Sequence, residues 1–444
     1  MIWVYDVAVF LFALFSIPKF LIRLNQAADP MRLVSERLGF FPGGFRALFR
    51  GQKTVWLHAV SVGEVMAAKN WIRLFLRRYR DWTVALSTTT PTGYSVAEGL
   101  ASERVIPFYA PVDWSFSVRR ALGTVRPKLI LLMETELWPN FITACGARNI
   151  PIGIVNGRMS PRSYRRYRWV RFWTRSILRK LSFCLVQSQR DKAYFRKLGM
   201  TPSRLLCVGN MKFDRLEGRS AAEVKKSFSF GRLLQNHLTL MGASTHWNEE
   251  AILLRVLRRL RPFFPGLRLI LAPRHPEQMR RVIRAAEREG VRIRFFSELS
   301  SGSDFDVLLV DRMGVLASVY PMADLVFVGG SFTRRGGQNP IEAAGVGKPV
   351  LHGPHVFNFH DLYQALDRGN GALQVDSEEE LFEQASRLFR QLQVRRQMGL
   401  QAQQIVESMR GASARTLAYL SSWCSPDGSQ TVAIPSAPMG IRSR

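Results

Sequence analysis

The sequence predicts an α/β protein with two doubly wound, Rossmann-like domains and an N-terminal membrane-anchor helix. Short apolar runs alternate with longer amphipathic stretches along most of the chain, which is typical of βαβ units and parallel sheets. The chain has 444 residues, the size of two ordinary domains. A charged, irregular stretch at 214–236 separates the two halves, as an interdomain connection would.

The first element is an apolar run at 7–18, between Asp6 and Lys19. As a helix it spans about 18 Å, short of the roughly 30 Å core of a bilayer unless flanking residues extend the insertion. Aromatic residues precede the run and basic residues follow it, which favours a membrane anchor at 1–23 over a buried core helix. The basic residues on its C-terminal side predict that the body of the protein lies in the cytoplasm.

Apolar runs in the first half predict a parallel sheet in an N-terminal domain at 24–213. We expect strands at 54–58, 83–88, 105–109, 129–133, 152–154 and 183–187. Amphipathic stretches predict helices at 63–79, 93–101, 114–125 and 162–180.

The second half repeats the pattern after the linker at 214–236. We expect strands at 238–242, 268–272, 291–295, 307–309, 325–328 and 349–351, in a C-terminal domain at 237–423. The remaining stretch, 424–444, is rich in Ser, Pro and Gly, which predicts a disordered tail.

Composition favours anionic partners. Lys and Arg number 63 against 34 Asp and Glu, a formal net charge of +29, which attracts nucleic acid, anionic lipid or phosphorylated substrates. The four cysteines are far apart and form no CxxC pair, so neither a zinc ribbon nor a disulfide framework is indicated, and a reducing compartment fits best.

The stretch at 158–180 carries nine basic residues and no acid, interleaved with aromatic residues. Such a face suits a membrane surface or acceptor phosphates. A solvated basic helix and a nucleic-acid surface are the alternatives, although no RRM, KH or zinc-finger pattern is present.

Polar clusters in the first half mark candidate site residues. The segment HAVSVGE at 58–64 places Glu64 in the first turn of a helix at the carboxyl edge of the sheet, as a general base or as a helix cap. METELWPN at 133–140 places Glu134 and Glu136 directly after a strand, for a polar ligand or for capping. GNMKFD at 209–214 places Lys212 on a turn, where it neutralises a leaving phosphate or is one more surface lysine.

The second half contains a candidate phosphate site. Arg274 and His275 end a strand and are donors suited to phosphate oxygens. GGSF at 329–332 and GGQNPIE at 336–342 form a glycine-rich loop that opens a helix. The loop matches neither the dinucleotide nor the P-loop pattern.

Two metal patterns are weighed and set aside. Asp304 and Asp306 match the D-x-D pattern of some transferases, but they immediately flank a residue that leads into a strand, and we interpret them as solvated turn acids. His352, His355 and His360 do not share helical spacing.

Taken in chain order, these clusters resemble the 3-deoxy-D-manno-octulosonic acid (Kdo) transferases, membrane-associated glycosyltransferases that add Kdo to the lipid A precursor. The resemblance runs from the anchor to about residue 420. Its pieces lie at 58–64, 88–93 (TTTPTG), 133–140, 209–214, 273–276 (PRHP), 329–332, 339–342 and 353–359 (GPHVFNF).

The resemblance implies a GT-B fold, with two Rossmann-like domains facing a cleft, the acceptor on the first and CMP-Kdo on the second. It implies inverting transfer without a metal or other cofactor, with Glu64 as general base and with Glu134 and Lys212 stabilising the transition state. The implied acceptor-side residues are His58, Ser61, Gly63 and Glu136. The implied donor-binding residues are Arg274, His275, Met313, Gly314, Val315, Ser331, Asn339, Pro340, Ile341 and Glu342.

The resemblance also implies the partners. These are CMP-Kdo, the lipid A precursor lipid IVA, which would receive one or more Kdo residues in lipopolysaccharide biosynthesis, and the bacterial inner membrane. The anchor and the basic surface would hold the protein at the cytoplasmic face of that membrane, and no nucleic acid is expected.

The chain departs from the family pattern at three places. Ala59 stands where many relatives have Gly or Ser. The segment DRMGVL at 311–316 has Val315 where a Glu is usual, and Gln338 replaces a His. Backbone contacts from 313–315 do not need a side chain, so they can persist.

Two other functions stay open. The first is a GT-B enzyme with a UDP-sugar donor, in which UDP-sugars, and not CMP, would protect the second domain. A non-enzymatic basic protein binding membrane or nucleic acid would tolerate loss of Glu64 and Lys212, and its affinity would fall steeply with salt.

Overall fold

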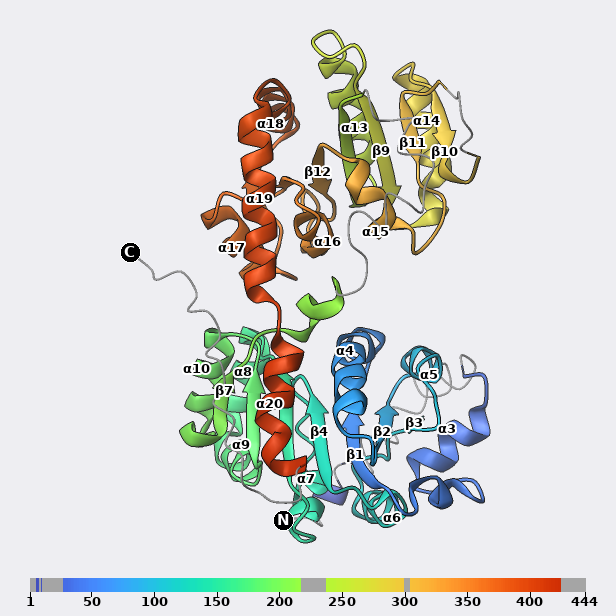
Figure 1. The fold of residues 1–444 in the computed structure, drawn as a ribbon, viewed down its shortest axis with the longest axis vertical. Helices are drawn as coiled ribbons and strands as arrows, with labels where there is room; N and C mark the ends of the chain where they lie inside the picture. The colour runs from blue at the N-terminus through green and yellow to red at the C-terminus, as the bar shows by residue number, and fades with distance from the viewer. Residues whose placement is uncertain (1–4, 8, 10–26, 217–236, 299–303, 425–444) are drawn as a thin grey trace. The chain divides into compact units, whose positions relative to one another are not determined.

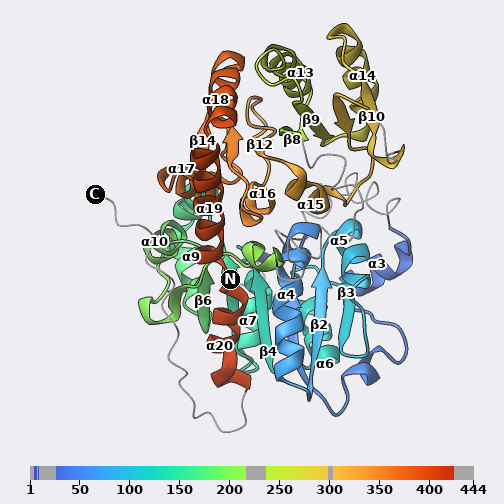
Figure 2. The ribbon, with the colours of Figure 1, turned by 45° about the horizontal axis from the view of Figure 1, so that its top comes forward.

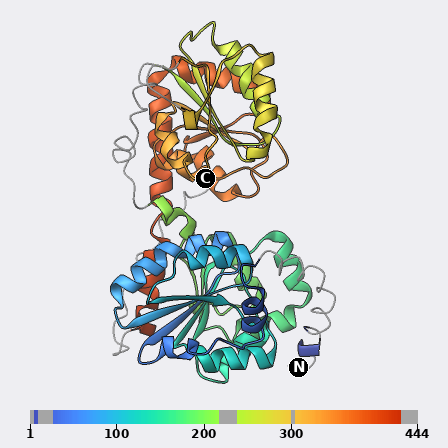
Figure 3. The ribbon, with the colours of Figure 1, turned by 90° about the vertical axis from the view of Figure 1, so that its right-hand side faces the viewer.

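The computed structural model describes residues 5–7, 9, 27–216, 237–298 and 304–424. The chain forms two compact units (Figure 1): unit 1 comprises Met1–Arg215 with Met409–Arg444, and unit 2 comprises Leu216–Ser408. Each contains a seven-stranded parallel sheet with helices on its faces, visible from two further directions in Figures 2 and 3. The predicted class of two doubly wound α/β domains is confirmed.

The sheet of unit 1 has the strand order β3-β2-β1-β4-β5-β6-β7. The strands are β1 (Lys53–His58), β2 (Trp82–Thr88), β3 (Val105–Tyr109), β4 (Leu129–Met133), β5 (Ile152–Gly157), β6 (Phe183–Val186) and β7 (Leu205–Cys207). The helices are α3 (Pro30–Arg37), α4 (Val62–Arg78), α5 (Pro91–Glu98), α6 (Ser115–Val125), α7 (Pro139–Gly146), α8 (Pro161–Trp169), α9 (Arg171–Leu178) and α10 (Gln189–Leu198), with short 3₁₀ turns η1 (Phe45–Phe49), η2 (Pro202–Arg204) and η3 (Met211–Leu216).

Both faces of this sheet are buried, which explains the continuous apolar runs. Successive residues of β1 point to opposite faces, so Val55 and Leu57 join one core cluster and Trp56 joins the other. The strand order reverses between β1 and β4, and open α/β sheets bind ligands at the carboxyl ends of strands beside such a switch point.

The sheet of unit 2 has the order β10-β11-β9-β8-β12-β13-β14, with its switch point between β8 and β12. The strands are β8 (Thr239–Thr245), β9 (Arg268–Pro273), β10 (Ile293–Phe295), β11 (Val307–Leu309), β12 (Leu325–Val328), β13 (Val350–His352) and β14 (Ala372–Gln374). The helices are α13 (Glu249–Leu260), α14 (Met279–Arg288), α15 (Leu316–Val319), α16 (Ile341–Gly345), α17 (His360–Arg368), α18 (Glu378–Arg390) and α19 (Leu392–Met409), with 3₁₀ turns η4 (Pro276–Gln278), η5 (Phe296–Glu298) and η6 (Tyr320–Met322).

The last helix, α20 (Ala412–Cys424), belongs to unit 1, where it packs against α4. The buried carboxylate of Asp214 fixes its start by accepting hydrogen bonds from the Gly411 and Ser413 amides at 2.7 and 2.6 Å. The predicted C-terminal domain at 237–423 therefore extends too far, because unit 2 ends at Ser408. Of the predicted linker, 214–216 lies in η3 and 217–236 lies outside the described residues.

The predicted helix at 162–180 is wrong as a single helix, because it breaks at Val170 into α8 and α9. The two halves have different partners. In α8, Tyr164 stacks on Tyr194 of α10, whereas α9 buries Ile177 and Leu178 in the core.

The predicted anchor at 1–23 lies outside the described residues except for positions 5–7 and 9, and so does the tail at 425–444. None of the described helices has the length and apolarity needed to cross a membrane. Within the predicted anchor, Asp6 hydrogen-bonds to Ser115 and Asn140 of unit 1.

Candidate active site

Glu64 lies in the first turn of α4, just past the carboxyl end of β1. Its buried carboxylate accepts a hydrogen bond from the Val60 amide and one from the Ser61 hydroxyl, both at 2.9 Å. These are the contacts of a helix-capping residue, so the prediction that Glu64 caps α4 is confirmed. Burial, and secondly the negative charge of Glu134, raise the pKa of Glu64 to about 7. A carboxyl group with that pKa is suited to proton transfer near neutrality.

Glu134 follows β4 directly and adopts a left-handed backbone with φ of 55°. A residue other than glycine is strained in this conformation, and such strained residues cluster at functional sites. Its Oε1 pairs with the Lys212 ammonium at 2.9 Å. Lys212 comes from η3 after β7, where its amide donates to Asn210 Oδ1 at 2.9 Å. The fold thus unites two residues that are 78 positions apart.

Glu136 lies on the same loop as Glu134. Its Oε2 accepts a hydrogen bond from Trp138 Nε1 at 2.8 Å. Burial, together with the charge of Glu134, raises the pKa of Glu136. Three acidic side chains and one lysine therefore share the carboxyl edge of the sheet at its switch point.

His58 ends β1 and is buried with a lowered pKa of about 3, because burial disfavours the imidazolium and Arg37 adds positive charge. It is therefore neutral at physiological pH. Its Nδ1 lies 2.9 Å from Ser87 Oγ, and its ring meets Trp138 edge-on at 4.6 Å between centroids. His58 thus packs against Trp138, the residue that donates a hydrogen bond to Glu136.

Ser61 and Gly63 shape the turn around Glu64. Ser61 is the N-cap of α4 and donates to Glu64, and a Cβ on Gly63 would reach only Ser61 Oγ at 3.9 Å. Gly93 in α5 is tighter, because a Cβ there would lie 2.8 Å from Thr90 Oγ1 and 3.3 Å from the Val60 carbonyl oxygen. The first predicted cluster and the TTTPTG segment therefore pack against each other.

In unit 2, a cavity of about 160 Å³ opens at the carboxyl ends of β9 and β11. Its lining includes Arg274, Met313 and Gly314, three predicted donor-binding residues, together with Ser244 and Asp311. Gly314 has φ of 81°, a conformation that favours glycine. The cavity lining does not include Val315, which is the N-cap of α15.

The glycine-rich loop after β12 is held by a buried carboxylate. Glu249 accepts hydrogen bonds from the amides of Gly330, Ser331 and Phe332 at 2.7 to 3.0 Å, and from the His246 amide at 2.9 Å. The fully buried Ser331 hydroxyl donates to the Val328 carbonyl and accepts from the Gly353 amide. Its side chain therefore holds the loop shape and has no exposed surface for a donor.

The other donor-side residues lie around the start of α16. Asn339 Oδ1 accepts from the Ile341 amide at 3.1 Å, Pro340 is the N-cap, and Ile341 is buried. Glu342 lies in the first turn of this helix. His275 is half-buried and its Nδ1 lies 3.2 Å from Glu277 Oε1.

His246 is a residue that the sequence interpretation missed. It follows β8, lies 5.2 Å from the His275 ring and contacts Gln338, the departure from the family pattern, with Nε2 atoms 3.1 Å apart. Its signal was available, since it is a polar residue just past a parallel strand. The predicted strand at 238–242 stopped too early to show it.

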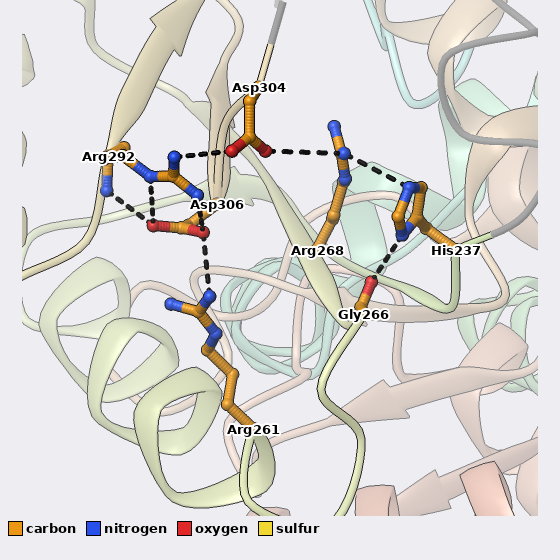
Figure 4. Close-up of polar contacts among 7 residues, drawn as sticks. All are labelled: His237, Arg261, Gly266, Arg268, Arg292, Asp304 and Asp306. Carbon is orange, nitrogen blue, oxygen red and sulfur yellow. Dashed lines mark hydrogen bonds and ion pairs between the residues drawn. The ribbon is translucent and has the colours of Figure 1, made fainter.

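Asp304 and Asp306 lie before β11, at the opposite end of the strands from Arg274, and Figure 4 shows their arginine partners. Arg292 pairs with both acids, at 2.5 Å to Asp304 and 3.2 Å to Asp306, and Arg261 pairs with Asp306 at 3.0 Å. The interpretation as solvated turn acids is wrong for Asp306, which is buried. Both acids form ion pairs near the amino-terminal end of β11.

The two parallel-sheet α/β units give the chain a GT-B-like fold. A glycosyltransferase from Rickettsia africae ESF-5 has a similar fold, with a TM-score of 0.57 over 84% of this chain and 98% of that chain, at 12% identity.

Sequence relatives narrow the class to one family. Residues 32–215 match the 3-deoxy-D-manno-octulosonic-acid transferase (kdotransferase) family. The 3-deoxy-D-manno-octulosonic acid transferase of Haemophilus influenzae is 33% identical over 87% of this chain and 90% of its own length. That of Bordetella pertussis is 32% identical over 83% of this chain and 87% of its own length. The chain belongs to the Kdo transferase family and is a glycosyltransferase, so the non-enzymatic alternative is excluded.

Proposed function

We propose that this enzyme transfers Kdo from CMP-Kdo to the lipid A precursor lipid IVA, with inversion and without a metal or other cofactor. The observation that carries the proposal is the buried Glu64, with a pKa of about 7, beside the Glu134–Lys212 pair. A carboxylate base and a nearby cation are the two groups that such a displacement requires.

In this mechanism, the Glu64 carboxylate takes the proton from the attacking acceptor hydroxyl. The acceptor oxygen bonds to the anomeric carbon of Kdo from the face opposite CMP, which inverts that centre. The bond between the anomeric carbon and the CMP phosphate oxygen breaks, and CMP departs with the electron pair. Glu64 then releases its proton to solvent.

Lys212 and Glu134 would act on the charges that develop during transfer. The Lys212 ammonium would counter the negative charge on departing CMP, and the Glu134 carboxylate would favour the oxocarbenium-like centre. The ion pair at 2.9 Å holds both side chains before substrate binds. This pre-organisation avoids reorganising charged groups during the reaction.

Unit 2 would bind CMP-Kdo. Arg274, and the backbone around Gly314, line the cavity for the nucleotide, and the loop ahead of α16 supplies contacts for ribose and phosphate. Only a monophosphate leaves, so no diphosphate charge has to be neutralised by a divalent cation. A UDP-sugar donor stays the alternative.

We place the enzyme at the cytoplasmic face of the bacterial inner membrane, in lipopolysaccharide biosynthesis. The support is the basic surface of α8 and α9, where Trp169 is 89% exposed and Phe172 is 85% exposed among arginines. Exposed aromatic and basic side chains together suit an anionic lipid surface. No nucleic-acid partner is part of this proposal.

The proposal is tested by Glu64→Gln, which keeps the side-chain volume but cannot take the proton. Turnover should fall by about 10²–10⁴-fold. CMP binding measured by calorimetry should stay unchanged, because the nucleotide residues lie in unit 2. Glu98→Gln, an exposed glutamate on α5, is the matched control. Near wild-type turnover of Glu64→Gln would disprove the assignment of the base, and binding of UDP in preference to CMP would favour the alternative donor.

A further inference from the structure

The N-terminal residues Tyr5 and Asp6 contact the starts of α6 and α7 and a residue of α9. Asp6 Oδ1 accepts hydrogen bonds from Asn140 Nδ2 at 2.6 Å and from the Ser115 amide at 3.1 Å, and Oδ2 contacts the Ser115 hydroxyl. The Tyr5 ring lies 5.3 Å from Trp173 of α9. These contacts join residues more than a hundred positions apart.

Two helices that lack a local cap, α6 and α7, receive their capping hydrogen bonds from the carboxylates of Asp6 and Asp113. Neither α6 nor α7 has a side-chain hydrogen bond from its own N-cap residue. Asp6 satisfies the first amide of α6, and Asp113 accepts from the Asn140 and Phe141 amides at the start of α7, at 3.2 and 2.8 Å. Carboxylates at helix N-termini satisfy free amides and complement the helix dipole.

The second carboxylate depends on the same segment. Asp113 is half-buried, and burial raises its pKa to about 6, while a hydrogen bond from Tyr5 stabilises its charged form. The Asn140 side chain then bridges the two acids, because its Nδ2 donates both to Asp6 and to the Asp113 carbonyl oxygen at 2.7 Å. The N-terminal segment thus contacts the start of α6 directly and the start of α7 through Asn140 and Asp113.

The start of α7 is directly connected to the candidate site. Its N-cap, Trp138, donates to Glu136 and packs edge-on against His58. We propose that Asp6 is a positioning residue, which acts through Asn140 and Trp138 to hold the Glu134–Glu136 loop in the geometry that transfer requires. This inference rests on the proposed placement of the acceptor at that loop. It gives the N-terminal segment a role in transfer that is separate from membrane attachment.

The test compares Asp6→Ala, Asp6→Asn and the control Glu103→Ala, an exposed acid of unit 1, in the full chain. Acceptor is supplied in detergent micelles, so that membrane attachment does not limit the rate. Asp6→Ala should lower kcat/KM for the acceptor by about tenfold or more, since small displacements of reacting groups are costly. The donor KM should not change. Asp6→Asn keeps an acceptor oxygen and should recover most of the loss, and Glu103→Ala should match wild type.

Hydrogen exchange of the peptide covering 133–142 gives a readout that does not depend on activity. Asp6→Ala should speed exchange there and leave unit 2 unchanged. Wild-type exchange together with wild-type kcat/KM in Asp6→Ala would overturn the inference, and so would an equal loss in Asp6→Asn. Transfer by the wild-type enzyme, measured first, tests the proposed function separately.

A charge exchange covers the case in which Asp6→Ala does not fold. Asn140→Asp sets two carboxylates against each other and should lose activity. The double variant Asp6→Asn with Asn140→Asp restores a donor and an acceptor between these two side chains and should be more active than Asn140→Asp alone. Failure of the double variant to exceed Asn140→Asp alone would overturn the inference.

Discussion

Glu64 has a capping geometry and a base-like pKa at once. The hydrogen bonds from Val60 and Ser61 favour its carboxylate, whereas burial and Glu134 disfavour it more strongly, and the net pKa is about 7. Spacing alone shows the helix start but not the depth of burial or the neighbouring charge. The residue type and position of the base are therefore predictable from sequence, and its tuning is not.

The pKa of Glu64 predicts the pH dependence of transfer. The base acts as the carboxylate, so turnover should rise as pH increases through about 7. Glu134→Gln removes a charge that raises this pKa, so its residual activity should rise at a lower pH than in wild type. The measurement is kcat against pH from 5 to 9, with Glu98→Gln as control. An unshifted inflection in Glu134→Gln would contradict the coupling of the two carboxylates.

At the level of elements, continuously apolar strands are predictable, whereas two short, partly buried strands were not predicted. The strands at 105–109, 129–133, 307–309 and 325–328 match the prediction, because both sheet faces are covered and the runs are continuously apolar. The edge strands β7 and β14 were missed, since each has three residues and is only partly buried. Pairings such as Glu134 with Lys212 depend on tertiary structure and carry no local signal.

The basic surface of α8 and α9 predicts binding to anionic lipid. Replacing Trp169 and Phe172 by Ser removes two exposed aromatic side chains and should weaken binding by about tenfold. The measurement is sedimentation of the full chain with vesicles of phosphatidylglycerol and phosphatidylethanolamine. Phe263→Ser, an exposed aromatic residue of unit 2, is the control. Equal binding by wild type and the double variant would exclude this surface.

At the scale of the whole molecule, the chain enters unit 2 once and returns to unit 1 in α20. That return was not predicted because an amphipathic C-terminal helix fits either domain by its pattern alone. What fixes it is specific: the Asp214 carboxylate at the helix start, and packing on α4, which carries Glu64. Both contacts lie within unit 1.

Asp214→Ala should therefore destabilise unit 1 by about 1–3 kcal/mol, because the Gly411 and Ser413 amides at the start of α20 lose their acceptor. Calorimetry should show that unit 1 unfolds at a lower temperature in the variant than in wild type. CMP should still stabilise unit 2. Glu103→Ala, an exposed acid of unit 1, should have no effect. An unchanged transition in Asp214→Ala would show that packing alone holds α20.

The most direct test of the central claim is mass spectrometry of lipid IVA after incubation with the purified enzyme and a CMP-Kdo-generating mixture containing EDTA. The account predicts mass gains in whole Kdo units, which would demonstrate the donor, the acceptor and metal-independent transfer together. Absence of any gain from a folded preparation that binds CMP would contradict the account.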